Sequence, residues 1–289
     1  MKKFIAVIAI VFVLAGLGLE KFDLGGTTTA GNASSSAKKV AGTVTSGIHQ
    51  TVSGIASALP GHRSSPAAPS NLESVTYRSG SSAVITVNGN QSTLNPADWK
   101  GNKVIYSSLD PLNRTSQPNT GYLEERNLAK DTLRVRQIVK PTGWHQKFSD
   151  GEAILNRGHL IAYSLSKGIA YTGAYEPSLQ SGDQNNPKNL FTQTAFSNQE
   201  IQTIYESKVR DALKRGKKVI YQAQAIFSGN DFMAKGVQLQ AISTDRSLNF
   251  NVFIFNVQPG FQFNYADGTS WVNRSMTVPT PIGAPHFSN

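Results

Sequence analysis

The segment around His159 holds residue types that could do acid–base chemistry. The chain has five histidines, and His159 ends the run Asn156-Arg157-Gly158-His159. Imidazole titrates near pH 6.5, so at a working pH near neutral it can take a proton from water. Arg157 places a cation beside the imidazole, and we expect Gly158 to give the backbone conformational freedom there. The alternative interpretation is a partly buried, structural histidine at the end of a strand.

A second polar cluster follows at four-residue intervals: Asn198, Gln202, Glu206 and Arg210. Positions i and i+4 lie on one side of a helix, so an amide, a carboxylate and a guanidinium would share one edge. The plainer interpretation of the same spacing is a polar helix face. In that case a Glu206–Arg210 ion pair would contribute about 0.2–0.5 kcal/mol.

One long helix would carry this cluster. Ser197 with Glu200 three residues later has the pattern of a capping box, and Gly216 among basic residues is typical of a helix end. An apolar stripe beside the polar edge would pack on the core: Ile201, Ile204, Tyr205, Val209, Ala212 and Leu213.

Strands are expected through most of the remaining C-terminal region. Residues 83–87 and 91–94 predict a hairpin around Asn88-Gly89, because this pair tolerates the positive φ of tight turns. Other β-type runs cover 103–107, 133–139, 219–227, 237–243 and 248–257. The pattern predicts an α+β fold with a mixed, largely antiparallel sheet and few helices.

Composition excludes several classes of protein. Hydrophobic residues make up 39% of the 289, enough to fill a core, so a wholly disordered chain is excluded. The absence of cysteine excludes disulfide scaffolds, thiolate metal sites and cysteine nucleophiles. The net charge of +10 favours nucleic acid or another polyanion as partner, although a basic protein without a special partner also fits. No feature predicts a protein partner.

Residues 1–24 are predicted to be a signal peptide or an N-terminal membrane anchor. Lys2 and Lys3 precede an apolar run over 4–19 whose length lies between those of a signal peptide and a spanning helix. A buried soluble helix is a third alternative. Either targeting segment would export the remainder, so we expect an extracytoplasmic bacterial protein, membrane-anchored or secreted.

Residues 25–71 are predicted to be a disordered linker rich in Gly, Ala, Ser and Thr. The segment contains no aromatic and no acidic residue, so it cannot bury enough apolar area to fold. Apolar residues recur every three or four positions between Val40 and Leu59, which leaves a transient helix as the alternative. The folded domain is predicted over 72–289.

The run at 156–159 resembles the Asp-Arg-Gly-His motif of the DNA/RNA non-specific endonuclease family, the ββα-metal (His-Me finger) nucleases. Similarity extends from about Tyr106 through 140–144 to 256–260, and the chain is most similar to membrane-anchored DNA-uptake nucleases and secreted DNases of Gram-positive bacteria. The resemblance implies an active site built from two strands and a helix.

The resemblance also implies a role for each matching residue. His159 corresponds to the family's general base, and Asn198 to the single protein ligand of a magnesium ion. Glu206 corresponds to the carboxylate that reaches metal-bound water. Asn189 matches an amide that steadies the site, and Arg210 a basic residue of its outer part.

Further basic residues are candidates for the same site. Arg157 belongs to the motif and is counted with the catalytic residues. An upstream arginine that grips phosphate is typical of the family, and Arg134 or Arg136 could fill that place. Arg126 is a weaker candidate, and Lys188 is a further candidate for substrate binding.

The implied function is a magnesium-dependent endonuclease that hydrolyses DNA to 5′-phosphate ends, with RNA as an open second substrate. Magnesium prefers oxygen ligands and keeps its waters, so one amide oxygen can anchor it, and manganese also suits the site. Contacts to the phosphate backbone carry no sequence information, so little sequence preference is expected. DNA uptake, nutrient scavenging and degradation of host DNA stay open as biological roles.

Asn156 departs from the family's Asp. An amide keeps an acceptor oxygen but loses the charge, which would weaken its hold on metal-bound water. This departure motivates one rival, a non-catalytic surface protein that binds or takes up DNA on the same fold. A second rival is a basic cell-wall adhesin, in which Asn198 and Glu206 are only part of a helix face.

Overall fold

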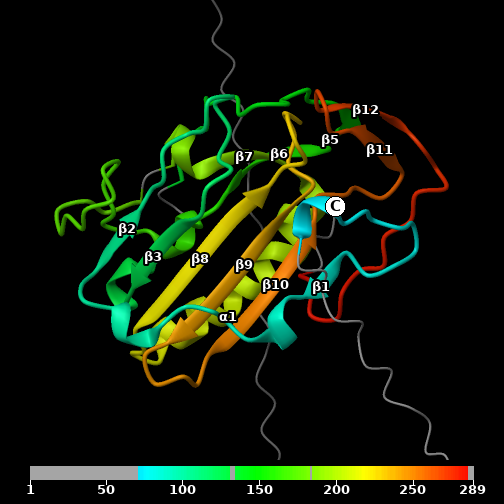
Figure 1. Ribbon diagram of the computed structural model, residues 1–289. Helices are drawn as coiled ribbons and strands as arrows, with labels where there is room; N and C mark the ends of the chain where they lie inside the picture. Colours follow the sequence, from blue (N-terminus) through cyan, green and yellow to red (C-terminus); the bar gives the residue numbers. More distant parts are fainter. Residues whose placement is uncertain (1–70, 131–133, 183, 286–289) are drawn as a thin grey trace, which may run out of the picture. The chain divides into compact units, whose positions relative to one another are not determined.

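The computed structural model describes residues 71–130, 134–182 and 184–285, which Figure 1 draws in colour. The predicted targeting segment at 1–24 and nearly all of the predicted linker, including its apolar positions between 40 and 59, lie outside these residues. Within the described ranges, no helix has both the length and the apolar character needed to cross a bilayer.

A six-stranded antiparallel sheet forms the centre of the domain, in the order β1-β10-β9-β8-β3-β2. Every neighbouring pair in it is antiparallel, which confirms the predicted sheet type. Its strands are β1 (Val84–Thr86), β2 (Lys103–Ile105), β3 (Asn119–Leu123), β8 (Val219–Ile226), β9 (Gly236–Ser243) and β10 (Asn249–Phe255). The long strands β8 to β10 coincide with the strands predicted over 219–227, 237–243 and 248–257.

The helix α1 (Thr203–Lys214) packs against one face of this sheet and lies behind it in Figure 1. The rings of Tyr205 and Phe250 are 5.3 Å apart, which joins α1 to β10. Val209 and Leu213 are fully buried in the same core cluster as Phe250. The chain leaves the helix through Gly216 at φ 72°, as the sequence predicts.

A separate two-stranded unit precedes α1. The strand β6 (Leu155–His159) pairs antiparallel with β7 (Leu190–Thr194), and a π-helical segment (Phe196–Gln202) leads from β7 into α1. This is the predicted arrangement of two strands and a helix. Asn256 ties it to the end of β10, since it accepts a hydrogen bond from Thr194 N at 2.7 Å and donates one to Thr192 O at 3.0 Å.

The remaining strands of the described residues form two small hairpins. One joins β4 (Phe148–Ser149) to β5 (Glu152–Ala153), and the other joins β11 (Phe261–Asn264) to β12 (Thr269–Val272). They meet through a second core cluster that contains Ile154, Phe261 and Phe263.

The predicted hairpin over 83–94 is wrong. Residues 84–86 form β1, which pairs with β10, while 91–95 form no strand. Three successive residues, 88 to 90, have positive φ and open the reversal beyond a two-residue turn. The free edge of β10 supplies the partner instead, with hydrogen bonds from Val87 N to Asn251 O at 2.9 Å and from Phe255 N to Ala83 O at 2.8 Å.

The strand predicted over 133–139 is also wrong for its described part, 134–139, which is irregular. Side-chain amide oxygens accept hydrogen bonds from its backbone N–H groups, which in a sheet would bond to a neighbouring strand. Val135 N donates to Gln184 Oε1 and Ile138 N to Asn185 Oδ1, each at 2.9 Å. Two of its apolar side chains are exposed, Val135 at 56% and Ile138 at 72%.

The capping box predicted at Ser197 and Glu200 is not formed. Helical structure already begins at Phe196, so Ser197 lies inside the π-helical segment. Its N–H donates to Thr194 Oγ1 at 3.1 Å, and the N–H of Phe196 donates to Gln258 Oε1 at 2.9 Å. A residue of β7 and one distant in sequence thus satisfy the first N–H groups of the helix.

Candidate active site

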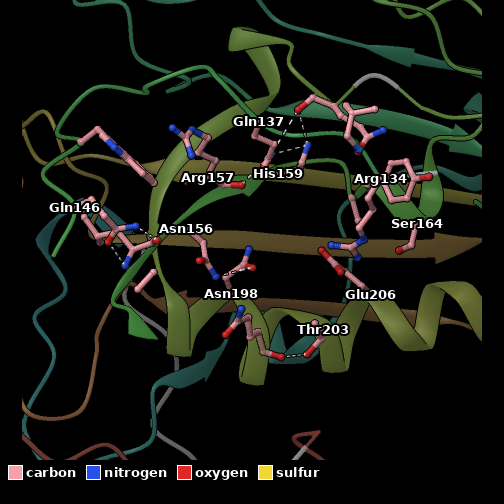
Figure 2. A pocket seen from close by; sticks show the side chains of 18 residues that line it. Arg134, Gln137, Gln146, Asn156, Arg157, His159, Ser164, Asn198, Thr203 and Glu206 are labelled. Atoms are coloured by element: carbon pink, nitrogen blue, oxygen red, sulfur yellow. Dashed lines mark hydrogen bonds between the residues drawn. The ribbon is translucent and has the colours of Figure 1, made fainter. Parts of the chain in front are cut away.

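A cavity of about 500 Å³ opens beside β6, the π-helical segment and α1. Figure 2 shows polar side chains entering it from these elements and from the irregular segment at 134–137. Three of the five predicted catalytic residues line it, Arg157, His159 and Glu206, whereas Asn189 and Arg210 do not. The predicted metal ligand Asn198, the phosphate-binding candidate Arg134 and Asn156 of the motif also line it. Three stretches distant in sequence therefore meet at one site.

The pairing of β6 with β7 explains the glycine of the motif. Gly158 is opposite Phe191, and Asn156, two residues earlier on β6, is opposite Gln193. A Cβ at Gly158 would lie 2.1 Å from Gln193 Oε1, where no atom fits. Gly158 does not have positive φ, so the expectation that it supplies backbone freedom is wrong. Glycine is required because the Gln193 side chain covers that position.

His159 is held at the end of β6 by contacts to its ring. His159 Nε2 lies 3.3 Å from the carbonyl oxygen of Gln184 and 3.4 Å from Gln137 Nε2. Desolvation lowers the pKa of His159 to about 4; the contact with Gln184 opposes this shift, and the charge of Arg134 adds to it. The ring is therefore neutral at physiological pH. When Nε2 carries the proton and donates it to Gln184, Nδ1 is left as the proton acceptor.

Asn198 projects from the π-helical segment toward Asn156. Asn198 Nδ2 donates to Gln193 Oε1 at 2.8 Å, and Asn198 Oδ1 accepts from Asn156 Nδ2 at 3.4 Å. In Figure 2 the two asparagine side chains point toward each other across the floor of the cavity. Gln193 thus fixes which end of the Asn198 amide faces the cavity, and that end is the oxygen.

Gln202 connects both sides of the site. Its side chain is 1% exposed and donates to the backbone oxygen of His159 and to Glu206 Oε1, each at 2.8 Å. Gln202 Oε1 in turn accepts from Gln193 Nε2 at 3.0 Å. The buried side chains of Gln193 and Gln202 therefore connect His159, Asn198 and Glu206 through hydrogen bonds.

Glu206 is a largely buried carboxylate beside two arginines. Burial raises the pKa of Glu206, while the hydrogen bond from Gln202 and the charges of Arg210 and Arg134 lower it. Arg210 Nη1 lies 3.7 Å from Glu206 Oε2 and donates to Ser164 Oγ at 2.9 Å. The predicted i,i+4 ion pair is thus present and borders the cavity.

Two arginines line the cavity itself. The guanidinium of Arg134 lies over the ring of Tyr163, 5.5 Å from its centroid, and points toward Glu206 in Figure 2. Arg157 lies over Trp144 at 4.4 Å, and its Nε donates to the carbonyl oxygen of Val139. Arg134 is thus the better placed of the predicted phosphate-binding candidates.

Three other candidates lie outside the cavity lining: Arg126, Arg136 and Lys188. Arg126 pairs with Glu124 at 2.7 Å and lies over the ring of Tyr175 at 5.2 Å, because the short turn after β3 directs it there. In the irregular segment that contains Arg136, the lining residues are Arg134, Val135 and Gln137.

Asn189 is fully buried and supports the site from behind. Its Oδ1 accepts from Ile161 N at 2.8 Å, and its Nδ2 donates to Ile161 O at 2.9 Å. This clamp holds the chain two residues beyond His159. Asn189 is not among the residues that line the cavity, and its role in steadying the site stays a prediction.

Several residues of the site were missed at the level of the sequence: Gln137, Trp144, Gln146, Gln184 and Gln193. The available signal was at 192–194, where three polar residues continue an apolar strand. All of β7 is buried, and buried polar groups must be hydrogen-bonded. That rule points to Gln193 as part of a network.

The donors present suit a hydrated divalent cation. Asn198 directs its oxygen into the cavity and Glu206 supplies a carboxylate, and oxygen donors of this kind suit magnesium. The described residues contain no cluster of three or more His, Cys, Asp or Glu side chains that could hold a metal ion.

The family model for DNA/RNA non-specific endonucleases matches residues 71–276. The chain belongs to this family. The match spans the twelve strands of the described residues and α1, and it includes every residue that lines the cavity. The enzyme class is thus a nuclease, with nucleic acid as substrate.

Solved structures of nucleases share this fold. NucA from Streptococcus agalactiae with magnesium bound is 31% identical, with a TM-score of 0.55, over 66% of this chain and 88% of NucA. Its metal-free form is 29% identical, with a TM-score of 0.56, over 68% and 90%. Sda1 nuclease with bound zinc is 19% identical, with a TM-score of 0.50, over 66% of this chain and 97% of Sda1.

Proposed function

We propose that this protein is a magnesium-dependent, sequence-non-specific endonuclease that hydrolyses DNA to 5′-phosphate ends. The observation that carries the proposal is the meeting of His159, Asn198, Glu206 and Arg134 at one cavity. Family membership supports the nuclease class, and the magnesium bound to NucA supports the choice of metal. Manganese is the alternative ion, and RNA the second substrate.

Each side chain has a definite task in this proposal. The neutral His159 takes the proton of the attacking water, and Arg134 holds the non-bridging phosphate oxygens in a charge-assisted contact. Asn198 Oδ1 would hold the ion directly, and the Glu206 carboxylate would hold it through water. A bound magnesium supplies positive charge that offsets the charge developing on the phosphate and on the leaving 3′ oxygen.

We further propose that the protein acts outside the cytoplasm, either anchored through residues 1–24 or secreted after their removal. The support is the pair of lysines before the apolar run in the sequence. Separating membranes from culture medium and detecting the protein in each fraction tests this. Recovery of the full-length protein in the cytoplasmic fraction alone would contradict it.

One observation favours a second candidate, a DNA-binding protein without catalysis. Asn156 Nδ2 donates into Asn198 Oδ1, the oxygen proposed to hold the metal. The test is incubation of purified protein with plasmid in magnesium, with and without EDTA, alongside a gel-shift assay. Cleavage that EDTA abolishes supports the nuclease, whereas a shifted but intact plasmid supports the second candidate.

A further inference from the structure

The β4–β5 hairpin contributes Ala153 to the lining of the cavity and carries an exposed aromatic ring, that of Phe148. Asp150 and Gly151 connect its strands at φ 52° and 86°, and Phe148 is directly opposite Ala153. Residues directly opposite each other in an antiparallel pair project from the same face. Phe148 and Ala153 therefore share a face of the hairpin.

That face is the one turned toward the cavity. Ala153 lines the cavity, and so does Gln146, which lies two positions before Phe148 in the chain. Gln146 is fixed there, because its Nε2 donates to Leu155 O at 2.7 Å and its Oε1 accepts from Leu155 N at 3.1 Å. Because Phe148 is opposite Ala153, its side chain projects from the cavity side of the hairpin.

The opposite face of the hairpin is covered by the β11–β12 hairpin. Ile154 packs in one cluster with Phe261 and Phe263 of β11. Lys147, which alternates with Gln146 and Phe148, donates from Nζ to the carbonyl oxygen of Ser270 in β12. The hairpin is thus held from behind, and the Phe148 side chain is 67% exposed.

We propose that Phe148 stacks on an unpaired base of the nucleic-acid strand that is being cleaved. The proposal rests on the proposed nuclease function and adds a preference for single-stranded over duplex substrate. Ala153 precedes Asn156 by three residues, about 10 Å of extended chain, so Phe148 lies near the nucleotides that flank a phosphate in the cavity. An exposed ring held by a rigid hairpin is the surface that sequence-tolerant stacking on bases requires.

Duplex DNA cannot use this ring in the same way. Its bases are paired and stacked on one another, so a base must leave the stack before it meets Phe148. A single strand offers its base faces without that cost. The ring would therefore favour single-stranded substrate without reading its sequence.

The test compares kcat/KM of the full-length wild type and Phe148→Ala on three substrates, with magnesium in the assay buffer. These are a mixed-sequence DNA single strand, the same strand with abasic sites, and its duplex. Loss of the ring should cost about fivefold to a hundredfold on the normal single strand and less than twofold on the other two. Phe148→Trp should keep the wild-type preference.

Trp271→Ala is the matched control, because Trp271 is 51% exposed and follows Ser270 on the hairpin behind. It should leave all three rates unchanged. Equal losses on all three substrates for Phe148→Ala, or no loss on the single strand, would overturn the proposal.

Fluorescence anisotropy of the labelled single strand in EDTA separates this proposal from the proposed function. If wild type cleaves nothing, the nuclease proposal fails, yet weaker binding by Phe148→Ala, with the abasic strand unaffected, would still support the stacking role. Equal binding of the normal strand by wild type and Phe148→Ala would overturn it.

Discussion

Gln193 Oε1 accepts a hydrogen bond from Asn198 Nδ2 at 2.8 Å, and this contact turns the oxygen of Asn198 toward the cavity. Gln193 is fully buried and donates to Ser197 Oγ and Gln202 Oε1, so its own orientation is fixed. A rotated Asn198 amide would leave Gln193 Oε1 without its donor. The oxygen that suits a metal is thus selected by a residue with no metal contact of its own.

Asn198→Ala should act through the metal. Removal of the only proposed direct ligand should raise the magnesium concentration for half-maximal cleavage by at least tenfold, with part of the rate regained in excess metal. Gln199→Ala is the control, because Gln199 is an exposed neighbour that also lines the cavity. Superimposable magnesium titrations for wild type and Asn198→Ala would refute the assignment.

The pH profile of kcat/KM should have an acidic limb well below pH 6.5. Desolvation lowers the pKa of His159 to about 4, and a base must be unprotonated to work. Activity should therefore persist through weakly acidic pH and be lost as the pH falls through about 4. Arg134→Gln should shift the limb upward, because it removes a charge that disfavours protonation. A wild-type limb at pH 6.5 would contradict the account.

Asn156→Asp should raise activity modestly and tighten apparent magnesium affinity. The change removes the N–H that Asn156 directs at Asn198 Oδ1 and adds a negative charge beside the proposed cation site. Cleavage rates across a magnesium titration provide the measurement. A loss of more than about tenfold, or 1.4 kcal/mol of barrier, would show that the site depends on the amide.

Gly158→Ala should destabilise the domain by about 1–3 kcal/mol and reduce activity. Its Cβ would meet Gln193 Oε1 at 2.1 Å and Gln193 Cβ at 2.8 Å, displacing the residue that orients Asn198. Urea unfolding measures the stability change. Gly101→Ala is the control, since nothing lies within 4 Å of a Cβ there. Equal unfolding midpoints for the two variants would contradict the steric explanation.

The sequence predicted what depends on local pattern. The apolar runs of β8, β9 and β10, the stripe of α1 and the i,i+4 series from Asn198 to Arg210 are all found in the structure. The resemblance to the family predicted that His159, Asn198 and Glu206 share one site, and all three line the cavity.

The errors arose where distant groups compete for the backbone. β1 pairs with β10 and not with residues 91–94 as predicted. Residues 134–139 have no neighbouring strand, and the side-chain amides of Gln184 and Asn185 accept their backbone hydrogen bonds. Thr194 took over the capping position predicted for Ser197. The glutamine network was missed for the same reason, because its partners lie in β7 and in the π-helical segment and only the fold brings them together.

The most direct test of the account is plasmid cleavage by wild type and His159→Ala in saturating magnesium, with binding checked by gel shift. Loss of a positioned base should slow cleavage about 10²–10⁴-fold while plasmid binding and the circular dichroism spectrum stay unchanged. EDTA should abolish the wild-type activity. A folded His159→Ala variant that cleaves at nearly the wild-type rate would contradict the central claim.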